Sequence, residues 1–171
     1  MRLNKGPAGA HSAGTVSDLE TRLNDGDHKA LRLWLRLLAC SNRIEAEINR
    51  RLRTDFSTTL ARFDLMAQLQ RSPDGLKMNE LSRRLMVTGG NVTGLTDQLE
   101  RDGLVERSED LADRRAYSVR LTALGQERFD AMALVHETWV VELLGGLGAS
   151  EKLTVYNLLG KLKSHLNSAS R

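Results

Sequence analysis

The amino-acid sequence predicts a mainly helical fold with one small β-hairpin. Only two of the 171 residues are proline and aromatic residues make up 4% of the chain, so the core must be built mainly from leucine, valine, methionine and alanine, as is typical of helices. Apolar residues recur at a helical spacing along most of the chain, whereas residues 104–122 show the period of two that strands require.

The N-terminal part of the sequence predicts an arm followed by a long helix. Residues 1–23 contain the helix-breaking segment Gly6-Pro7-Ala8-Gly9 and are expected to form a loosely held arm. The helix covers residues 28–53, because apolar residues form a stripe along it and arginines occupy the opposite face. Asp25 or Asp27 is its expected N-cap.

The middle of the sequence predicts three helices, the last two of which are separated by very few residues. The first covers residues 59–70 and ends at the turn sequence Ser72-Pro73-Asp74-Gly75, after which residues 76–78 are expected to be extended. The second covers residues 79–86, and the third runs from Thr88, an expected N-cap, to Gly103. A tight turn is therefore expected between the second and the third of these helices.

The remaining sequence predicts a hairpin and two helices. Residues 104–122 are expected to form a β-hairpin whose long loop carries basic residues at its tip. Helices follow over residues 123–144 and 150–166, with Ser150 as the expected N-cap of the last one. The predicted fold class is therefore mainly α with a small β wing.

Two short helices followed by a hairpin form a winged helix-turn-helix, in which the second helix enters the major groove of DNA. Small residues at the start of that helix let the backbone approach DNA, and its first amides point at phosphates. Arginines in the hairpin loop suit phosphates or a narrow minor groove. Taken singly, the glycines are an ordinary turn and the arginines a solvated loop, but their order and spacing together favour DNA binding. The predicted contacts, beside Asp97 on the same helix face, are Thr88, Gly89, Gly90, Asn91, Thr93, Gly94, Arg114 and Arg115.

Over about residues 30–166, the sequence resembles the MarR family of transcriptional regulators. The resemblance implies an obligate homodimer, formed by the N- and C-terminal helices, that binds a palindromic operator and is usually released by a small aromatic ligand. It matches Thr88, Asn91 and Thr93 with recognition-helix contacts and gives Asp113 the role of orienting an arginine, whereas Gly94 replaces the long side chain of many relatives. The segments that carry it are Arg62-Phe63-Asp64-Leu65-Met66, Leu81-Ser82-Arg83-Arg84-Leu85, Asn91-Val92-Thr93-Gly94-Leu95, Leu99-Glu100-Arg101-Asp102-Gly103-Leu104-Val105, Asp113-Arg114-Arg115 and Leu121-Thr122.

The resemblance also implies a division of the chain and a ligand pocket. Residues 1–23 are the arm, 24–58 the N-terminal dimerisation helix, 59–122 the DNA-binding lobe and 123–171 the C-terminal dimerisation helices. The pocket is expected between the dimerisation helices and the lobe, although ordinary core packing is the alternative for each of its residues. They are Trp34, Arg36, Arg43, Phe63, Met66, His136 and Trp139.

A finer resemblance is to the branch of the family that regulates hydroxycinnamate catabolism and responds to aryl-CoA thioesters. It is carried by Gly75-Leu76-Lys77-Met78 through Gly94, together with His136-Glu137 and Trp139-Val140. Arginines on the first helix would suit the phosphates of such a thioester. The predicted function is thus a repressor released by an aromatic effector, with a constitutive or architectural DNA-binding protein as the alternative.

Other classes of function are disfavoured by what the sequence lacks. It has no glycine-rich phosphate loop, no nucleophile elbow, no metal-ligand cluster and four scattered histidines, so an enzyme, a cofactor and a metal site are not expected. Cys40 is the only cysteine and is expected to be a structural thiol rather than a redox switch. No apolar run is long enough for a membrane span, and a cytoplasmic protein is expected.

Overall fold

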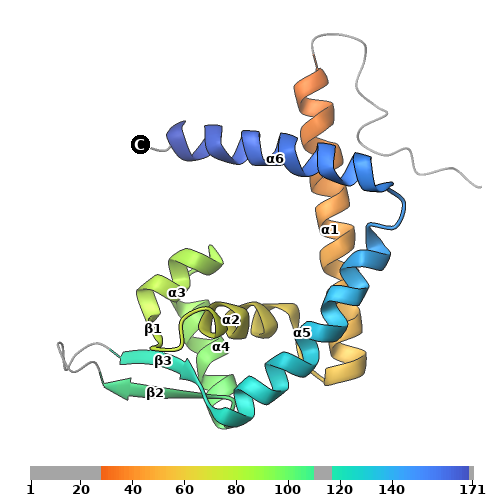
Figure 1. Cartoon of the computed structure of the whole chain (residues 1–171). Coiled ribbons are helices and arrows are strands. Elements are labelled where there is room, and N and C mark those ends of the chain that lie inside the picture. Colours follow the sequence, from red (N-terminus) through yellow and green to blue (C-terminus); the bar gives the residue numbers. More distant parts are fainter. Residues whose placement is uncertain (1–27, 110–116, 170–171) are drawn as a thin grey trace, which may run out of the picture. The chain divides into compact units, whose positions relative to one another are not determined.

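The computed structural model describes residues 28–109 and 117–169. The chain divides into two compact units, residues 1–43 and 44–171, and each is described by itself. The predicted fold class is confirmed: the described residues form helices and one small antiparallel sheet (Figure 1). The division falls inside the first helix, whereas the predicted domain boundary at residues 58 and 59 coincides with the loop after it.

Helix α1 (Lys29–Phe56) begins near its predicted start but runs on past Arg53, where the prediction ended it. It ends because Ser57 adopts the left-handed conformation with φ of 52°, a position that usually holds glycine and that the sequence therefore did not signal. Asp25 and Asp27, the predicted caps, lie outside the described residues. In the unit that starts at Ile44, the helix buries Ile48 and Leu52.

Helix α2 (Leu60–Gln70) supplies the centre of the core. The hydroxyl of Thr59 caps it by accepting a hydrogen bond from the backbone N–H of Arg62. Its buried residues lie on more than one face, because elements pack around most of the helix. They are Phe63, Leu65, Met66 and Leu69.

Helices α3 (Met78–Leu85) and α4 (Gly89–Arg101) form the predicted pair of short helices. The tight turn between them is made possible by Met86, which ends α3 in the left-handed conformation with φ of 54°. Helix α3 ends one residue earlier than predicted, and α4 ends before Gly103, which takes the predicted positive φ of 70°. Both helices bury apolar side chains against α2 and the sheet, among them Leu81, Val92 and Leu99.

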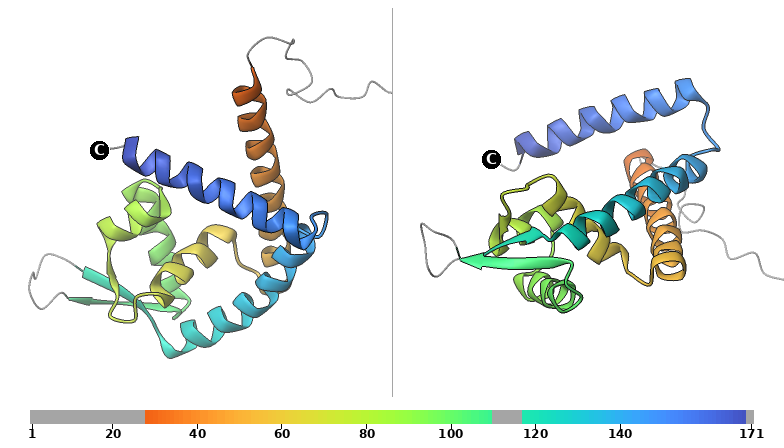
Figure 2. Two further views of the ribbon diagram at one scale, coloured as in Figure 1. Left: turned by 45° about the horizontal axis from the view of Figure 1, so that its top comes forward. Right: turned by 60° about the horizontal axis from the view of Figure 1, so that its bottom comes forward.

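The sheet contains a third strand that the sequence did not reveal as such. The hairpin β2 (Val105–Glu109) and β3 (Tyr117–Leu121) was predicted, with Val105 opposite Leu121. Strand β1 (Leu76–Lys77), predicted only as an extended piece, pairs with β3 so that Leu76 lies opposite Val119. The order is therefore β1-β3-β2 (Figure 1). The paired strands β2 and β3 lie side by side in both views of Figure 2. A two-residue strand carries too little periodicity to be recognised without its partner.

Helix α5 (Ala123–Leu143) begins where the backbone of Leu104, just before β2, comes close to it. Thr122 caps the helix through its hydroxyl, which accepts from the N–H of Gly125 at 3.0 Å. The backbone N–H of Thr122 donates to the carbonyl of Leu104 at 3.1 Å. A Cβ atom on Gly125 would lie 1.9 Å from the same carbonyl oxygen, so only glycine allows this approach.

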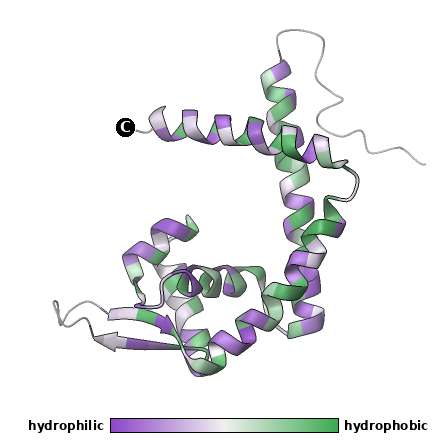
Figure 3. Ribbon diagram, viewed as in Figure 1, coloured by the Kyte–Doolittle hydropathy of each residue, from purple (hydrophilic) through white to green (hydrophobic). Residues whose placement is uncertain are grey.

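Helix α6 (Ala149–Ala169) begins one residue before Ser150, so the predicted cap is wrong. The carboxylate of Glu151 accepts a hydrogen bond from the N–H of Gly148 at 2.7 Å instead, which is the arrangement that a helix start favours. No residue of α6 is buried, although apolar residues recur along its whole length (Figure 3).

Candidate functional site

The second helix of the helix-turn-helix has the two faces that the sequence predicted. Val92, Thr96 and Leu99 are buried and hold α4 against the lobe. Thr96 is a buried polar residue that the sequence analysis missed, and its hydroxyl is satisfied by the carbonyl of Val92 at 2.8 Å. The face proposed for DNA is exposed at Thr88, Gly89, Gly90, Asn91 and Thr93, and half-buried at Gly94.

The hydroxyl groups of this face are used differently. Thr88 takes the extended N-cap conformation but makes no side-chain capping bond, so the first amides of α4 keep their hydrogen-bonding capacity for another partner. The hydroxyl of Thr93 donates to the carbonyl of Gly89 at 3.0 Å. Asn91 is exposed, and its amide is therefore available to solvent or to a ligand.

The three glycines of α4 are not required by the fold. A Cβ atom built on Gly89, Gly90 or Gly94 would meet nothing within 4 Å, and none of them has a positive φ. Glycine inside a helix costs roughly 0.5–1 kcal/mol relative to alanine. A helix that carries three such glycines, two of them exposed and one half-buried, gives up stability without any gain inside the protein.

Arg107 on β2 connects the wing to the end of α4. Its guanidinium donates to Asp97 at 2.5 Å and to Glu100 at 2.7 Å. Asp97, which the sequence placed on the DNA-facing side, is therefore occupied by an ion pair within the lobe and does not present a free carboxylate. Two carboxylates at the end of α4 thus share one half-buried guanidinium, and these charged hydrogen bonds link the wing to the helix.

The loop between β2 and β3, which contains Asp113, Arg114 and Arg115, lies outside the described residues. The strands that lead to it are paired up to Glu109 and Tyr117. The hydroxyls of Ser108 and Ser118 are 3.1 Å apart across the two strands, so the hairpin is held closed to the base of the loop.

Four residues of the expected ligand pocket lie in the unit from Ile44 onward, and the structure brings two of them together. The rings of Phe63 and His136 are 4.8 Å apart, and Phe129, which sequence reasoning missed, stacks on Phe63 at 5.3 Å. Burial lowers the pKa of His136. Trp139 is buried elsewhere, against Phe56 with ring centroids 6.2 Å apart, and Met66 is buried in the core.

The other three expected residues, Trp34, Arg36 and Arg43, lie in the N-terminal unit and are exposed there. Arg36 lines a shallow basic hollow of about 340 Å³ together with Lys29, Arg32 and Leu33. Cys40, which was expected to be a structural thiol, is exposed in the single chain.

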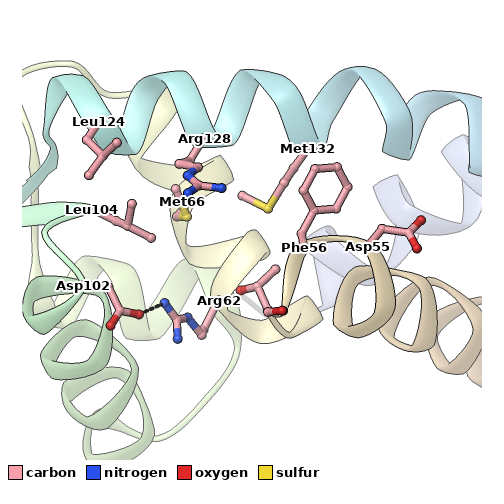
Figure 4. Close-up of a pocket in the computed structure, with 11 residues that line it drawn as sticks. Asp55, Phe56, Arg62, Met66, Asp102, Leu104, Leu124, Arg128 and Met132 are labelled. Carbon is pink, nitrogen blue, oxygen red and sulfur yellow. Dashed lines mark hydrogen bonds and ion pairs between the residues drawn. The ribbon is translucent and has the colours of Figure 1, made fainter.

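A separate cavity of about 440 Å³ opens between the end of α1, α2, the end of α4 and α5 (Figure 4). Arg62 and Arg128 reach its interior from opposite walls, and Nη2 of Arg62 donates to Oδ2 of Asp102. Of the expected pocket residues only Met66 lines it. Its other lining residues are Asp55, Phe56, Ser57, Thr58, Leu104, Leu124 and Met132.

An ion-pair network ties α1 to α5 beside Trp139. Arg51 donates to Glu47 at 2.7 Å and to Glu142 at 2.6 Å, and its guanidinium lies 5.9 Å from the Trp139 ring. Hydrogen bonds from Arg50 and Arg51 lower the pKa of Glu47 to about 2, and the bond from Arg51 lowers the pKa of Glu142. This network orients α5 rather than forming a reactive site.

Within residues 28–109 and 117–169, no group of three or more His, Cys, Asp or Glu side chains is arranged to hold a metal ion. None of the helices formed by those same residues combines the length and the apolarity that crossing a membrane requires.

Comparison with known proteins finds similarity to transcriptional regulators of the helix-turn-helix type. The sequence profile of the MarR family matches residues 56–116, which extend from the end of α1 into the loop of the wing. The chain is 33% identical over 89 residues to an uncharacterised HTH-type transcriptional regulator, YkoM, of Bacillus subtilis (strain 168), covering 52% of this chain and 58% of that protein. The chain thus spans less than two thirds of the length of the curated relatives it matches first.

Solved structures match over a greater length. The crystal structure of a MarR family transcriptional regulator from Silicibacter pomeroyi is similar with a TM-score of 0.71 and 35% identity, covering 84% of this chain and 99% of that one. A mutant MarR from E. coli, crystallised in complex with operator DNA, gives a TM-score of 0.71 and 26% identity, covering 81% of this chain and 99% of that one.

Proposed function

The chain belongs to the MarR family of transcriptional regulators, and on that premise we propose that it is a repressor that binds a palindromic DNA operator as a homodimer. Helix α4 enters the major groove and the wing contacts the adjacent backbone or minor groove. Asn91 and Thr93 read base edges, while Arg114 and Arg115 bind phosphates or the narrow groove. The likeness to a MarR structure with bound operator DNA supports this assignment.

The observation that carries the proposal is the exposed, glycine-rich start of α4. Gly89 and Gly90 meet nothing inside the protein, and the N-cap residue Thr88 leaves the first amides without a side-chain bond. A surface without side chains and with free amides at a helix N-terminus suits the close approach of a phosphate backbone. The cost of the glycines is then offset by contacts that exist only in the DNA complex.

Homodimerisation through α6 follows from its unburied apolar residues. Val155, Leu158, Leu159, Leu162 and Leu166 recur at the spacing of one helix face, and each is at least 40% exposed. A stripe of this size normally marks an interface. A second copy of the chain is the partner that gives two recognition helices for a palindromic site.

We further propose that an aromatic effector, such as a hydroxycinnamoyl-CoA, lowers operator affinity. Phe63 contacts both Phe129 and His136 in the unit from Ile44 onward, and this aromatic cluster, in which Phe63 and Phe129 are buried, would have to open to admit a planar ring. The hollow at Arg36 lies in the N-terminal unit, and its basic residues suit phosphates. Arg43, Trp34, Met66 and Trp139 remain expected members of the site. The alternative is a constitutive DNA-binding protein without an effector.

Substitutions in α4 and in the wing loop are expected to have different effects on DNA binding. Asn91→Ala should cost about 1–3 kcal/mol at the contacted base pair, because one hydrogen-bonded base contact is lost. Arg114→Ala and Arg115→Ala should weaken binding to every duplex and flatten its salt dependence. Fluorescence anisotropy over a series of salt concentrations measures both effects. Asn157→Ala on exposed α6 is the control, and equal affinity of all four variants would refute the docking model.

The effector is tested by a gel-shift titration with hydroxycinnamoyl-CoA, the free acid and CoA alone. The thioester is expected to release the duplex, whereas the free acid does little, because both ring and phosphates contribute binding energy. Release by the free acid at the same concentration would show that the phosphates are irrelevant. Release by none of the three would support the constitutive alternative.

A further inference from the structure

We propose that Met86, in the turn that joins α3 to α4 (Figure 1), is a specificity-determining residue that contacts the C5-methyl group of a thymine in each half of the operator. The inference rests on the proposed function, because it adds a base contact to the same DNA interface. Met86 lies outside the residues predicted from the sequence to contact DNA, the first of which is Thr88.

The side chain of Met86 is the most exposed large apolar side chain of the described residues, at 93%. The other methionines of the described chain are not exposed in this way. Met66 and Met132 belong to the core, and Met78 packs against it. A single exposed apolar residue is common on protein surfaces, so the exposure indicates function only in combination with the backbone conformation and the position of Met86.

The backbone of Met86 adopts a conformation that glycine forms more easily. Met86 ends α3 with φ of 54° and ψ of 34°, in the left-handed region, where a side chain is crowded by the backbone. Glycine is the usual residue at such a helix end, and the chain uses Gly103, with φ of 70°, just after α4. Glycine would form the tight turn at position 86 equally well. The methionine side chain therefore has a disadvantage for folding that the turn itself does not explain.

Hydrogen bonds hold the backbone next to Met86 in a defined position. The N–H of Val87 donates to the carbonyl of Ser82 at 3.2 Å, and the hydroxyl of Ser82 donates to the carbonyl of Val87 at 2.6 Å. The side chain of Val87 packs against the core, whereas that of Met86 extends into solvent. Because the turn is already ordered, a contact made by Met86 requires little further ordering of the backbone.

Met86 lies beside the start of the helix that is proposed to enter the major groove. Only Val87 separates it from Thr88, the N-cap residue of α4, so the Cα atoms of residues 86 and 88 are at most about 7.6 Å apart. Gly89 and Gly90 have no side chain with which to cover the first turn of α4, and the space beside them is empty. A long side chain next to these glycines can therefore reach the base edges that the start of α4 approaches.

The chemistry of the side chain identifies the group that it contacts. Among the groups that base pairs present in the major groove, the C5-methyl group of thymine is the apolar one, and the others are hydrogen-bond donors or acceptors. A thioether is a weak hydrogen-bond acceptor, but it is flexible and polarisable. Burial of a methyl group against it is favourable. Met86 thus recognises thymine by apolar contact, whereas Asn91 recognises its base by hydrogen bonds.

The test is a double-mutant cycle between the protein and the DNA. The duplex is the sequence that the full chain enriches from random DNA, and each thymine in turn is replaced by deoxyuridine, which lacks the methyl group. For the wild-type chain, replacement at one position of a half-site should weaken binding about fourfold, because one methyl-sized group is no longer buried. Met86→Ala should bind the thymine and uracil duplexes equally.

Two further variants are matched controls for the cycle. Met86→Leu keeps an apolar side chain of similar size and should still distinguish thymine from uracil. Asn91→Ala removes a different base contact and should retain the same fourfold discrimination, although its overall affinity is lower. Loss of the discrimination in both controls would show that it does not depend on the apolar side chain at position 86, and would contradict the proposal.

Met86→Gly separates the DNA contact from the stability of the turn. Glycine relieves the crowding of the left-handed conformation, so the urea midpoint of unfolding should rise by roughly 0.5 M. The discrimination between thymine and uracil should be lost in the same variant. A lower midpoint would mean that the Met86 side chain stabilises the fold, which would overturn the argument that its gain lies in the DNA complex.

Duplex binding distinguishes failure of this inference from failure of the proposed function. If a duplex is enriched but none of its thymines shows an effect that depends on Met86, the methyl contact is wrong and the proposed function stands. If Met86→Ala weakens binding to the thymine and uracil duplexes by the same factor, Met86 contacts the DNA backbone, and the methyl contact is again overturned. If no duplex is enriched, the proposed function fails and the methyl contact fails with it.

Discussion

Gly125→Ala is expected to lower the free energy of unfolding by about 3 kcal/mol, toward the upper end of what overpacking costs. The added Cβ atom would lie 1.9 Å from the carbonyl oxygen of Leu104 and 2.8 Å from its carbon. Both contacts are with backbone, so no side-chain rotation relieves them. The start of α5 must move away from Leu104, which breaks the hydrogen bond from the N–H of Thr122 to the carbonyl of Leu104.

Gly94→Ala is the matched control for this prediction. Gly94 is in the interior of α4, and a Cβ atom there would meet nothing within 4 Å. The same substitution is expected to raise the free energy of unfolding by roughly 0.5–1 kcal/mol, because alanine loses less backbone entropy. Urea unfolding followed by circular dichroism measures both. If both variants changed the free energy of unfolding in the same direction, Gly125 would not lie as close to the carbonyl of Leu104 as described.

Leu159→Glu combined with Leu162→Glu is expected to convert the proposed dimer into a monomer. Both leucines belong to the exposed stripe of α6 and are about 42% and 41% exposed in the single chain, so the fold does not depend on them. Two carboxylates facing their copies in an apolar interface are strongly unfavourable. Because a monomer engages only one half-site, duplex affinity should also fall by about a hundredfold or more.

Asn157→Glu combined with Ser164→Glu adds the same charge on the opposite side of α6 and is expected to leave the dimer intact. Analytical ultracentrifugation at micromolar concentration distinguishes the species. If the wild-type chain sediments as a monomer, or if the leucine variant remains a dimer, α6 is not the dimer interface.

The elements that the sequence predicted well are those whose signals are local. The stripe of α4 and the turn at Gly103 each depend on residues within a few positions of one another, and both are found in the structure. The errors occur where a distant segment decides. Strand β1 exists only because β3 pairs with it. Helix α1 ends only at Phe56 because Ser57 adopts the left-handed conformation there, which a serine in the sequence does not predict.

The DNA-facing side of α4 could be predicted from the sequence, whereas the contacts between different elements could not. The exposed face of α4 follows from periodicity, but Asp97 could not be recognised as an ion-pair partner because Arg107 lies on another element. The cavity was missed for the same reason. Arg62, Asp102 and Arg128 come from α2, the end of α4 and α5, and each one alone resembles an ordinary surface charge.

The central claim is that α4 and the wing bind specific duplex DNA as part of a dimer. Its most direct test is selection of binding sites from random duplexes with the full chain, followed by titration of the enriched duplex to determine stoichiometry. The predicted result is an inverted repeat bound by two protomers, with Asn91→Ala reducing the preference for that repeat. Enrichment of no sequence, or equal affinity for the selected and a scrambled duplex, would contradict it.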